Sequence, residues 1–291
     1  MSRRLRIYYM AVLGALGGLL SWWVIGAGER WLERLGGLPA VGAGLGLCMG
    51  ACLAVTDGAL AKRVAGRALR DGLAGALAGA LFGLAGLLLA ERGFLALGGG
   101  FGGRALAWML LGGLIGAADL LVSRRPRRAL YGALGGMAGG ALGGLLYEAL
   151  TQLFRAQSDR VQLVVGGIGL MLLGACLGAL IPLARQIFAR GELRVLTGEQ
   201  AGLAVEVTDL ATLGRYDGCE VYLPDPGVAW RHALVRRAEG GFALDVLADA
   251  GRAARVDGRE IAPGQSLALH GGERIDLGET VVTFVLCANM S

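Results

Sequence analysis

The 291-residue sequence has few charged residues, 18% against about 25% in ordinary soluble domains. Aromatic residues are also scarce, at 6%, whereas 55% of residues are hydrophobic, 53 are glycine and the mean hydropathy is +0.58. This composition excludes a single soluble globular domain. Lysine occurs only at Lys62 among 28 basic residues, a bias that indicates a GC-rich bacterial genome.

Cysteine and histidine are too few and too scattered for a disulfide framework or a common metal site. Five cysteines make an odd count, so we expect free thiols. Cys48 and Cys52 lie one helical turn apart without a third ligand nearby, which favours packing over metal binding. The sequence also lacks a glycine-rich phosphate loop, a nucleophile elbow and a plausible acid pair. We therefore expect no enzymatic activity, no metal and no cofactor.

Charge is divided unevenly along the chain. Residues 1–190 carry 19 basic and 8 acidic residues, whereas residues 191–291 carry 9 basic and 15 acidic residues. The net charges of the two parts are +11 and −6. The pI of 9.2 averages two unlike halves, so it does not indicate nucleic acid as a partner.

Six apolar stretches have about the 20 residues that a helix needs to cross a bilayer. We predict transmembrane helices at Ile7–Ala27, Leu38–Thr56, Gly72–Ala90, Ala105–Val122, Tyr131–Tyr147 and Val161–Ala184. The first stretch follows three arginines, as in a signal peptide, but it is too long and continues into Trp22 and Trp23. We therefore expect a retained anchor, with the lipid bilayer as a partner of residues 1–185.

Basic residues alternate between the two sides of the predicted helices. Three or four occur at the N-terminus, in the second and fourth loops and after the sixth helix, and each other loop has two. Positive charge resists translocation across the membrane. This pattern predicts a bacterial inner-membrane protein with both termini in the cytoplasm.

The six helices form three hairpins that repeat along the sequence at a nearly constant interval. Gly14, Gly75 and Gly135 recur at almost equal spacing, and a second series, Gly50, Gly112 and Gly174, recurs at equal spacing. Each copy has two spans, so all copies share one membrane orientation. This predicts a pseudo-threefold axis along the bilayer normal.

Glycines at helical spacing mark the first, third and fifth helices. The main stripes are Gly75, Gly79 and Gly83 in the third helix and Gly132, Gly136, Gly140 and Gly144 in the fifth. Small residues let helix backbones meet in lipid. We expect tight contacts at these stripes, with the fifth helix at the centre. Two interpretations of the stripes are open. They serve helix packing alone, or they form a bundle or homo-oligomer that lines a path.

Asp57 and Asp119 end the second and fourth helices on the predicted cytoplasmic side. An ionisable residue within a membrane is a candidate functional site. The two aspartates therefore have two interpretations, an ion path or carboxylates solvated at the membrane boundary.

From Gly191 onward the hydrophobic period changes from helical to two, as in Leu203–Val207 and Thr280–Val285. Turn residues separate these short runs. We predict one all-β sandwich over residues 193–291, joined to the helical membrane domain by a juxtamembrane link at 186–192.

Five segments of this half resemble the forkhead-associated domain family. The strand end Leu213–Arg215 is similar to the family's glycine-arginine pair. Four further runs resemble D-I-x-L-x-D-P, V-S-R-x-H-A, V-N-G-x-x-I and G-D-x-I-x-L-G; they are Cys219–Pro226, Val228–Ala233, Val256–Ile261 and Glu273–Gly278. The resemblance covers about Leu193 to Leu286. It implies an eleven-stranded sandwich in which Gly214, His232 and Gly258 are structural.

The resemblance also implies a phosphothreonine site made by an arginine, a serine and an asparagine. Arg215 matches the arginine, but Ala229 stands in the serine position and Arg252 in the asparagine position. A lost hydrogen bond to a charged group removes about 1.5–3 kcal/mol. Arg231 and Trp230 complete the candidate partner site, which is either a rebuilt anion site or a surface for unmodified protein.

Two functions remain open. The first is a membrane-anchored adaptor whose degenerate domain docks a cytoplasmic protein, phosphorylated or not, without conventional phosphothreonine recognition. The alternative is a channel or transporter that the domain regulates. A variant of the adaptor is an inner-membrane ring component of an envelope machine, by resemblance to forkhead-like domains of secretion systems.

Overall fold

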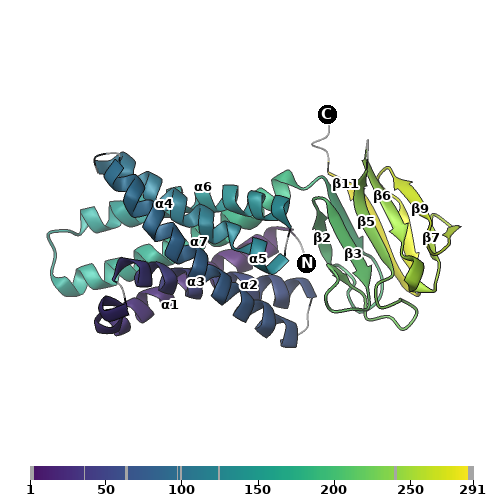
Figure 1. Cartoon of the computed structure of the whole chain (residues 1–291), viewed down its shortest axis with the longest axis horizontal. Helices are drawn as coiled ribbons and strands as arrows, with labels where there is room; N and C mark the ends of the chain where they lie inside the picture. Colours follow the sequence, from purple (N-terminus) through teal and green to yellow (C-terminus); the bar gives the residue numbers. More distant parts are fainter. Residues whose placement is uncertain are drawn as a thin grey trace. The chain divides into compact units, whose positions relative to one another are not determined.

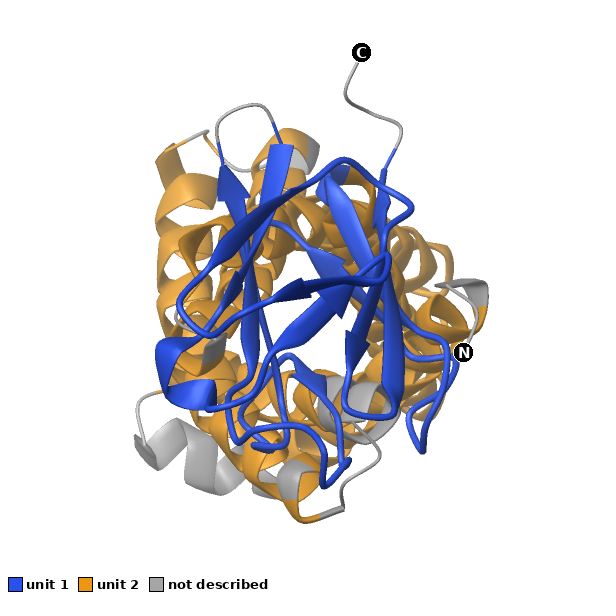
Figure 2. Ribbon diagram, turned by 90° about the vertical axis from the view of Figure 1, so that its right-hand side faces the viewer, with its two compact units in different colours: residues 1–3, 188–291 blue, residues 4–187 orange. Residues whose placement is uncertain are grey.

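The computed structural model describes residues 3–35, 37–62, 65–96, 98, 100–123, 125–238 and 241–287 (Figure 1). The side chains of residues 3–4, 27–35, 56–62, 65, 67, 100–101 and 123 lie outside this description. The chain forms two compact units, which Figure 2 shows in different colours. We call residues 4–187 the helical unit and residues 188–291, with 1–3, the sandwich unit.

The helical unit consists of long helices and the five-residue helix α5, joined by short connections. The helices are α1 (Arg3–Leu35), α2 (Leu38–Lys62), α3 (Ala65–Ala96), α4 (Gly100–Ala117), α5 (Asp119–Ser123), α6 (Pro126–Leu153) and α7 (Asp159–Phe188). Gly37 and Gly98 follow α1 and α3 with φ of +64° and +69°, a left-handed conformation that glycine adopts without strain. Pro126 begins α6, where its missing N–H removes no helical hydrogen bond.

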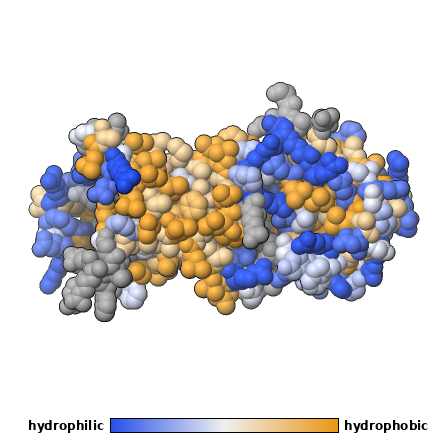
Figure 3. Space-filling view, viewed as in Figure 1, coloured by the Kyte–Doolittle hydropathy of each residue, from blue (hydrophilic) through white to orange (hydrophobic). Residues whose placement is uncertain are grey.

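Six described segments are long and apolar enough to cross a membrane, as the sequence predicts. They are Leu5–Gly26, Leu38–Val55, Ala68–Ala96, Gly102–Val122, Pro126–Leu153 and Asp159–Phe188. The fourth segment is interrupted at Ala118, between α4 and α5. The face of the helical unit seen in Figure 3 carries a broad hydrophobic band, which is the surface that lipid requires.

Two helix pairs cross through contacts between glycines. A Cβ added at Gly79 of α3 would lie 3.1 Å from the Cα atom of Gly50 in α2. In the same way, a Cβ at Gly136 of α6 would lie 3.2 Å from the Cα atom of Gly116 in α4. Backbone therefore packs on backbone at both crossings, the arrangement that small residues permit.

A third crossing of this kind joins the first and last helices. A Cβ at Gly14 of α1 would lie 3.1 Å from the Cα atom of Gly178 in α7. Each crossing thus joins the second helix of one predicted hairpin to the first helix of another, and the α1–α7 contact closes the set. A Cβ at Gly14, Gly75 or Gly136 would meet a carbonyl oxygen, that of Gly174, Gly50 or Gly112 respectively.

These matching contacts change one position in the predicted repeat. Gly136, not Gly135, occupies the place of Gly14 and Gly75, because Gly135 faces Ile181 of its own hairpin partner α7. The steps from Gly14 to Gly75 and from Gly75 to Gly136 are then equal in length. The threefold repeat remains a prediction, and the shared register of the three crossings supports it.

The buried apolar cluster of the helical unit comes from α2, α4 and α7. It includes Met49, Leu111 and Leu173, one from each helix and at equal spacing along the sequence. The expectation that the glycine-rich fifth helix, now α6, lies at the centre stays a prediction, since the buried glycines of α6 meet α4 on one face and α7 on the other. Glycines allow two backbones to approach, but they cannot fill the space among several helices, which needs large side chains.

The described residues of the sandwich unit form eleven strands. They are β1 (Gly191–Val195), β2 (Ala204–Val207), β3 (Leu210–Gly214), β4 (Val221–Tyr222), β5 (Ala233–Ala238), β6 (Gly241–Val246), β7 (Ala254–Val256), β8 (Arg259–Ile261), β9 (Ser266–Leu269), β10 (Arg274–Leu277) and β11 (Thr280–Leu286). One sheet has the order β2-β1-β11-β10-β7-β8 and the other the order β4-β3-β5-β6-β9. The core between them includes the rings of Phe242 and Phe284, whose centroids are 5.1 Å apart. The predicted all-β sandwich is confirmed.

The boundary between helix and sandwich is shorter than predicted. Helix α7 continues to Phe188 and β1 begins at Gly191, so only Ala189 and Arg190 separate them, whereas the sequence predicts a link at 186–192. Gly191 already pairs with Leu286 of β11, and Cys287 N–H donates a hydrogen bond to Arg190 O at 2.9 Å. Pairing with a distant strand sets this boundary, and local composition does not reveal it.

Candidate functional site

The loops β3–β4 (215–220), β4–β5 (223–232) and β6–β7 (247–253) gather at one end of the sandwich, which we call the apex. Backbone hydrogen bonds join them: Leu247 N–H donates to His232 O at 3.0 Å, and His232 N–H donates to Leu213 O at 2.9 Å. Four of the five predicted partner-binding residues lie in the first two loops, and Arg252 lies in the third. The fold therefore brings the predicted binding residues together.

Gly214 lets β3 pass close beneath the β4–β5 loop. A Cβ at this position would lie 2.5 Å from Trp230 O and 2.9 Å from the Cα atom of Arg231. The next residue, Arg215, donates its N–H to Ala229 O at 3.0 Å. Its side chain is exposed, and no ion pair of Arg215 occurs within the described part of the chain. The glycine thus lets the backbone of Arg215 lie against the β4–β5 loop.

Trp230 and Tyr216 form an aromatic platform at the apex. Their ring centroids are 5.0 Å apart with planes at 28°, and Trp230 is 60% exposed. Tyr216 N–H donates to Trp230 O at 2.8 Å, which ties the two loops together. The guanidinium carbon of Arg231 lies 5.6 Å from the Tyr216 ring centroid, a cation–π contact.

His232 is fully buried and holds the β4–β5 loop from within. Its Nδ1 accepts a hydrogen bond from Ala229 N–H at 3.2 Å. Burial lowers the pKa of His232, and the nearby Arg252 charge acts in the same direction, while backbone hydrogen bonds at Ala253 and Arg252 oppose the shift. A neutral, buried imidazole that accepts a backbone hydrogen bond fits the structural role implied by the sequence.

Arg252 spans two apical loops. Its Nη1 donates a hydrogen bond to Pro226 O at 2.6 Å. This bond uses part of the guanidinium fork to join the β6–β7 loop to the β4–β5 loop. A fork engaged in this way has fewer donors for an anion. The structure therefore places Arg252 at the apex, but as a clamp between loops.

Sequence reasoning did not single out Asp225, which it included only within the Cys219–Pro226 run. Its carboxylate accepts hydrogen bonds from Gly227 N–H at 2.7 Å, Glu279 N–H at 2.7 Å and the Thr280 hydroxyl at 3.0 Å. Burial tends to raise the pKa of Asp225, but these hydrogen bonds outweigh burial and lower it. Asp225 thus ties the β4–β5 loop to the start of β11. The aspartate-proline pair at this position was the feature of the sequence that could have pointed to this role.

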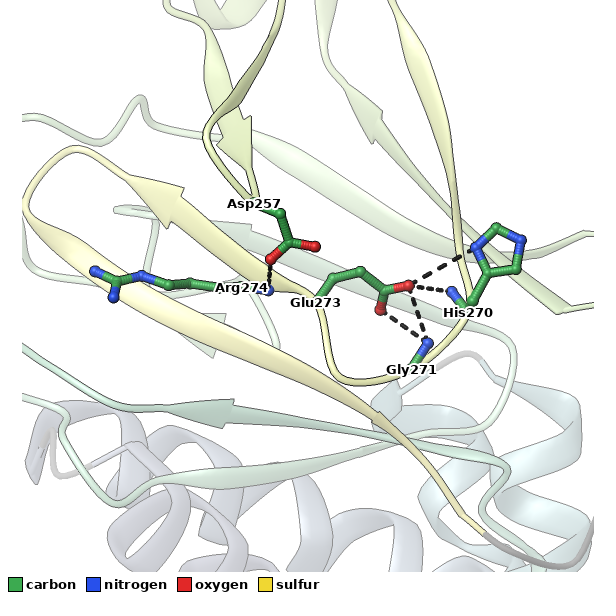
Figure 4. Close-up of polar contacts among 5 residues, drawn as sticks. All are labelled: Asp257, His270, Gly271, Glu273 and Arg274. Atoms are coloured by element: carbon green, nitrogen blue, oxygen red, sulfur yellow. Dashed lines mark hydrogen bonds and ion pairs between the residues drawn. The ribbon is translucent and has the colours of Figure 1, made fainter.

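Gly258 lies away from the apex, in the hairpin between β7 and β8. Asp257 and Gly258 have φ of +50° and +82°, as in the type I′ turn that two-residue hairpins favour. Figure 4 shows the polar contacts beside this turn: Asp257 Oδ1 accepts a hydrogen bond from Arg274 N–H at 2.9 Å. The Glu273 carboxylate accepts hydrogen bonds from His270 N–H and, at 2.8 Å, from Gly271 N–H. These contacts shape turns, and the His270 ring also lies near the carboxylate, with its Nδ1 3.8 Å from Glu273 Oε1.

In the helical unit, the predicted glycine stripes lie at helix crossings. Gly75, Gly79 and Gly83 face α2, and Gly132, Gly136 and Gly140 face α4, while Gly144 faces the Trp108 ring. Asp119 accepts a hydrogen bond from Arg128 Nε at 2.9 Å, and its Oδ2 lies 3.5 Å from Nη2 of the buried Arg185. Asp57 belongs to α2, but its side chain lies outside the described residues.

The FHA (forkhead-associated) domain family model matches residues 211–278. Similar solved structures include the FHA domain of CT664 protein from Chlamydia trachomatis, with 21% identity and a TM-score of 0.31, covering 34% of this chain and 100% of that chain. The FHA domain of an Arabidopsis thaliana hypothetical protein has 21% identity and a TM-score of 0.33, covering 36% and 92%. The N-terminal FHA domain of S. cerevisiae Rad53p, solved with a phosphothreonine peptide, has 12% identity and a TM-score of 0.30, covering 34% and 94%. No curated protein matches the chain.

Proposed function

Residues 211–278 are an FHA domain, and from this premise we propose that the chain is a membrane-anchored adaptor. In this proposal the apex docks a protein partner in the cytoplasm without conventional phosphothreonine recognition, and the helical unit holds the domain at a bacterial inner membrane. FHA domains mediate protein–protein interaction, and the proposal assigns the chain no catalytic step.

The state of the apex carries the proposal. Ala229 offers a methyl group where the family has a phosphate-binding hydroxyl, and its N–H already bonds to His232 Nδ1. Arg252 takes the asparagine position and binds Pro226 O. Of the three residues that the family uses, only Arg215 keeps its type. Each missing hydrogen bond to a phosphate removes about 1.5–3 kcal/mol, so two missing partners leave little affinity for phosphothreonine.

Three features support the anchor. The six candidate spans provide far more apolar length than one anchor requires. The basic loops alternate with loops that carry fewer basic residues, and the side rich in arginine is the one that stays in the cytoplasm. The sandwich follows α7 directly, so in the proposed topology it lies on the cytoplasmic side.

The interior of the helical unit favours an anchor over a channel. Met49, Leu111 and Leu173 lie in one buried apolar cluster, whereas an ion path needs polar groups or water along its length. Asp119, one of the two candidate path residues, is engaged by Arg128 and Arg185. A carboxylate held between two guanidinium groups acts as a fixed tie between α5, α6 and α7.

The test is affinity capture with the full chain from native membranes in mild detergent. A chain that ends at Arg190 is the matched control, because it keeps the helical unit and lacks the sandwich. We expect the full chain to capture a specific protein that the shortened chain does not. Phosphatase treatment of the extract before capture should leave the yield unchanged.

Two results would overturn the proposal. Capture of the same proteins by both chains, or of none by the full chain, removes the docking role. Capture that disappears after phosphatase treatment would show that the apex recognises phosphothreonine.

We also propose that the helical unit self-associates. The size of the protein particle in the same detergent measures this self-association.

A further inference from the structure

We propose that the apex binds an unmodified peptide segment in which a carboxylate side chain lies next to an aromatic side chain. The inference rests on the proposed function, because it names the partner chemistry of the same site. Three observations carry it: the exposed Trp230, the exposed Arg215, and the way the other polar groups of the apical loops are engaged.

Trp230 is the anchor for the aromatic side chain. A tryptophan that is 60% exposed on a folded domain leaves a large apolar surface in water, and tryptophan is enriched among the residues that contribute most to binding at interfaces. The platform is also ordered before binding, because Trp230 stacks on Tyr216 and its carbonyl accepts hydrogen bonds from the β3–β4 loop. A ring that is already held in place loses little conformational entropy on contact.

Arg215 provides the charge for the carboxylate. Its N–H bonds to the carbonyl of Ala229, directly before Trp230, so the backbone of Arg215 lies beside the platform and its side chain is exposed. Arg231 adds a second positive charge at the Tyr216 ring. Of the four acidic residues in these loops, Glu220 and Asp225 are held by internal hydrogen bonds, to Thr212 N–H at 2.8 Å and to Gly227 N–H at 2.7 Å. The other two, Asp217 and Asp249, form no ion pair with either arginine in the described part of the chain, so both arginines can receive an incoming acid.

The number of available donors favours a carboxylate over a phosphate. One guanidinium fork satisfies both oxygens of a carboxylate through two parallel hydrogen bonds. A phosphate presents a third oxygen and about twice the charge. Ala229 has no hydroxyl for that oxygen, and Arg252 already donates to Pro226 O. The apex therefore matches an aspartate or glutamate side chain better than a phosphothreonine.

The experiment measures fluorescence anisotropy of labelled peptides with the full chain in nanodiscs of neutral lipid. The probe is a short glycine-serine peptide with a central Glu-Trp pair. Three matched peptides replace the pair with Gln-Trp, Glu-Ala or phosphothreonine-Trp. We expect the Glu-Trp peptide to bind about tenfold more tightly than the Gln-Trp and Glu-Ala peptides, the usual effect of losing one interface anchor.

Single substitutions test which residue of the apex recognises each side chain of the Glu-Trp pair. Arg215→Ala should abolish the preference for Glu-Trp over Gln-Trp, because the guanidinium is the group that distinguishes them. Trp230→Ala should weaken binding of the Glu-Trp peptide about tenfold, so that this peptide no longer binds more tightly than Glu-Ala. Arg237→Ala, which removes an exposed arginine from β5, is the control. It should bind all four peptides as the wild type does.

Three results would overturn the inference. The Glu-Trp peptide fails to bind better than Glu-Ala, or Arg215→Ala keeps the preference for Glu over Gln, or the phosphothreonine peptide binds more tightly than Glu-Trp. The first two failures are distinct from failure of the proposed function, whereas the third also removes its claim that the apex does not recognise phosphothreonine conventionally. If the full chain still captures a phosphatase-insensitive partner that the chain ending at Arg190 does not, the adaptor role stands and only the partner chemistry is wrong.

Discussion

A methyl group added at the α4–α6 crossing should destabilise the helical unit by a predictable amount. In Gly136→Ala the new Cβ would lie 2.1 Å from the carbonyl oxygen of Gly112 and 3.2 Å from the Cα atom of Gly116. A carbon atom contacts a carbonyl oxygen at about 3.3–3.6 Å, so α4 and α6 must separate by roughly 1 Å. Separation weakens the dispersion contacts along the whole crossing.

The matched control is Gly166→Ala in α7, where a Cβ meets nothing within 4 Å. Replacing glycine with alanine inside a helix stabilises it by about 0.5–1 kcal/mol, and both variants share this gain. Overpacking costs about 1–3 kcal/mol and affects Gly136→Ala alone. We therefore expect Gly136→Ala to have a free energy of unfolding about 1–3 kcal/mol below that of Gly166→Ala.

The assay is reversible unfolding of the full chain in mixed micelles with increasing sodium dodecyl sulfate, followed by far-ultraviolet circular dichroism. The helical unit dominates this signal, because α-helices account for most of residues 4–187. Equal unfolding free energies for the two variants would refute the reasoning, since they would show that the crossing opens without cost.

Three further predictions concern the sandwich, each measured by hydrogen exchange of strand amides in the full chain. The folded pKa of Asp225 lies below its usual 3.8, so its stabilisation is complete above that pH and is lost as pH falls through the lowered value. Asp225→Asn should remove this acid-sensitive part, and an unchanged acid profile would contradict the role of the carboxylate. The pKa of His232 is below its usual 6.5, so stability should fall as pH drops below 6.5, down to the folded pKa. His232→Asn should flatten that slope, and a slope equal to that of the wild type would assign the effect to another group. Gly258→Ala, at φ +82° with open space around it, should cost about 1 kcal/mol from backbone strain alone, and no loss would show that the turn relaxes.

Features set by local composition were predictable from the sequence. The six apolar runs become the six candidate spans, because a bilayer-length hydrophobic run in a helix depends little on the rest of the chain. The FHA motifs located Arg215, Trp230 and His232 at one end of a sandwich, because each motif fixes a strand end or a loop. The alternation of hydrophobic residues gave the strand-rich region from Gly191 onward.

Features set by contacts between distant residues were not predictable. The sequence marks Arg252 as a change of residue type, but only the folded loops show that it binds Pro226, 26 residues away in the chain. The spacing of glycines in the sequence aligned Gly135 with Gly14 and Gly75. In the folded unit it is Gly136 that contacts α4 in the matching way. The buried cluster from α2, α4 and α7 also depends on three helices that meet only in the folded unit.

The contact between α1 and α7 has a consequence for biosynthesis. Gly14 and Gly178 are separated by almost the whole helical unit, and a ribosome adds about 5–20 residues per second. The first span therefore waits roughly 10–30 seconds in the bilayer before its last neighbour emerges. During that interval its small-residue face is open to lipid or to an insertion chaperone, so the order of synthesis, and not only the final packing, constrains which residues this face can carry.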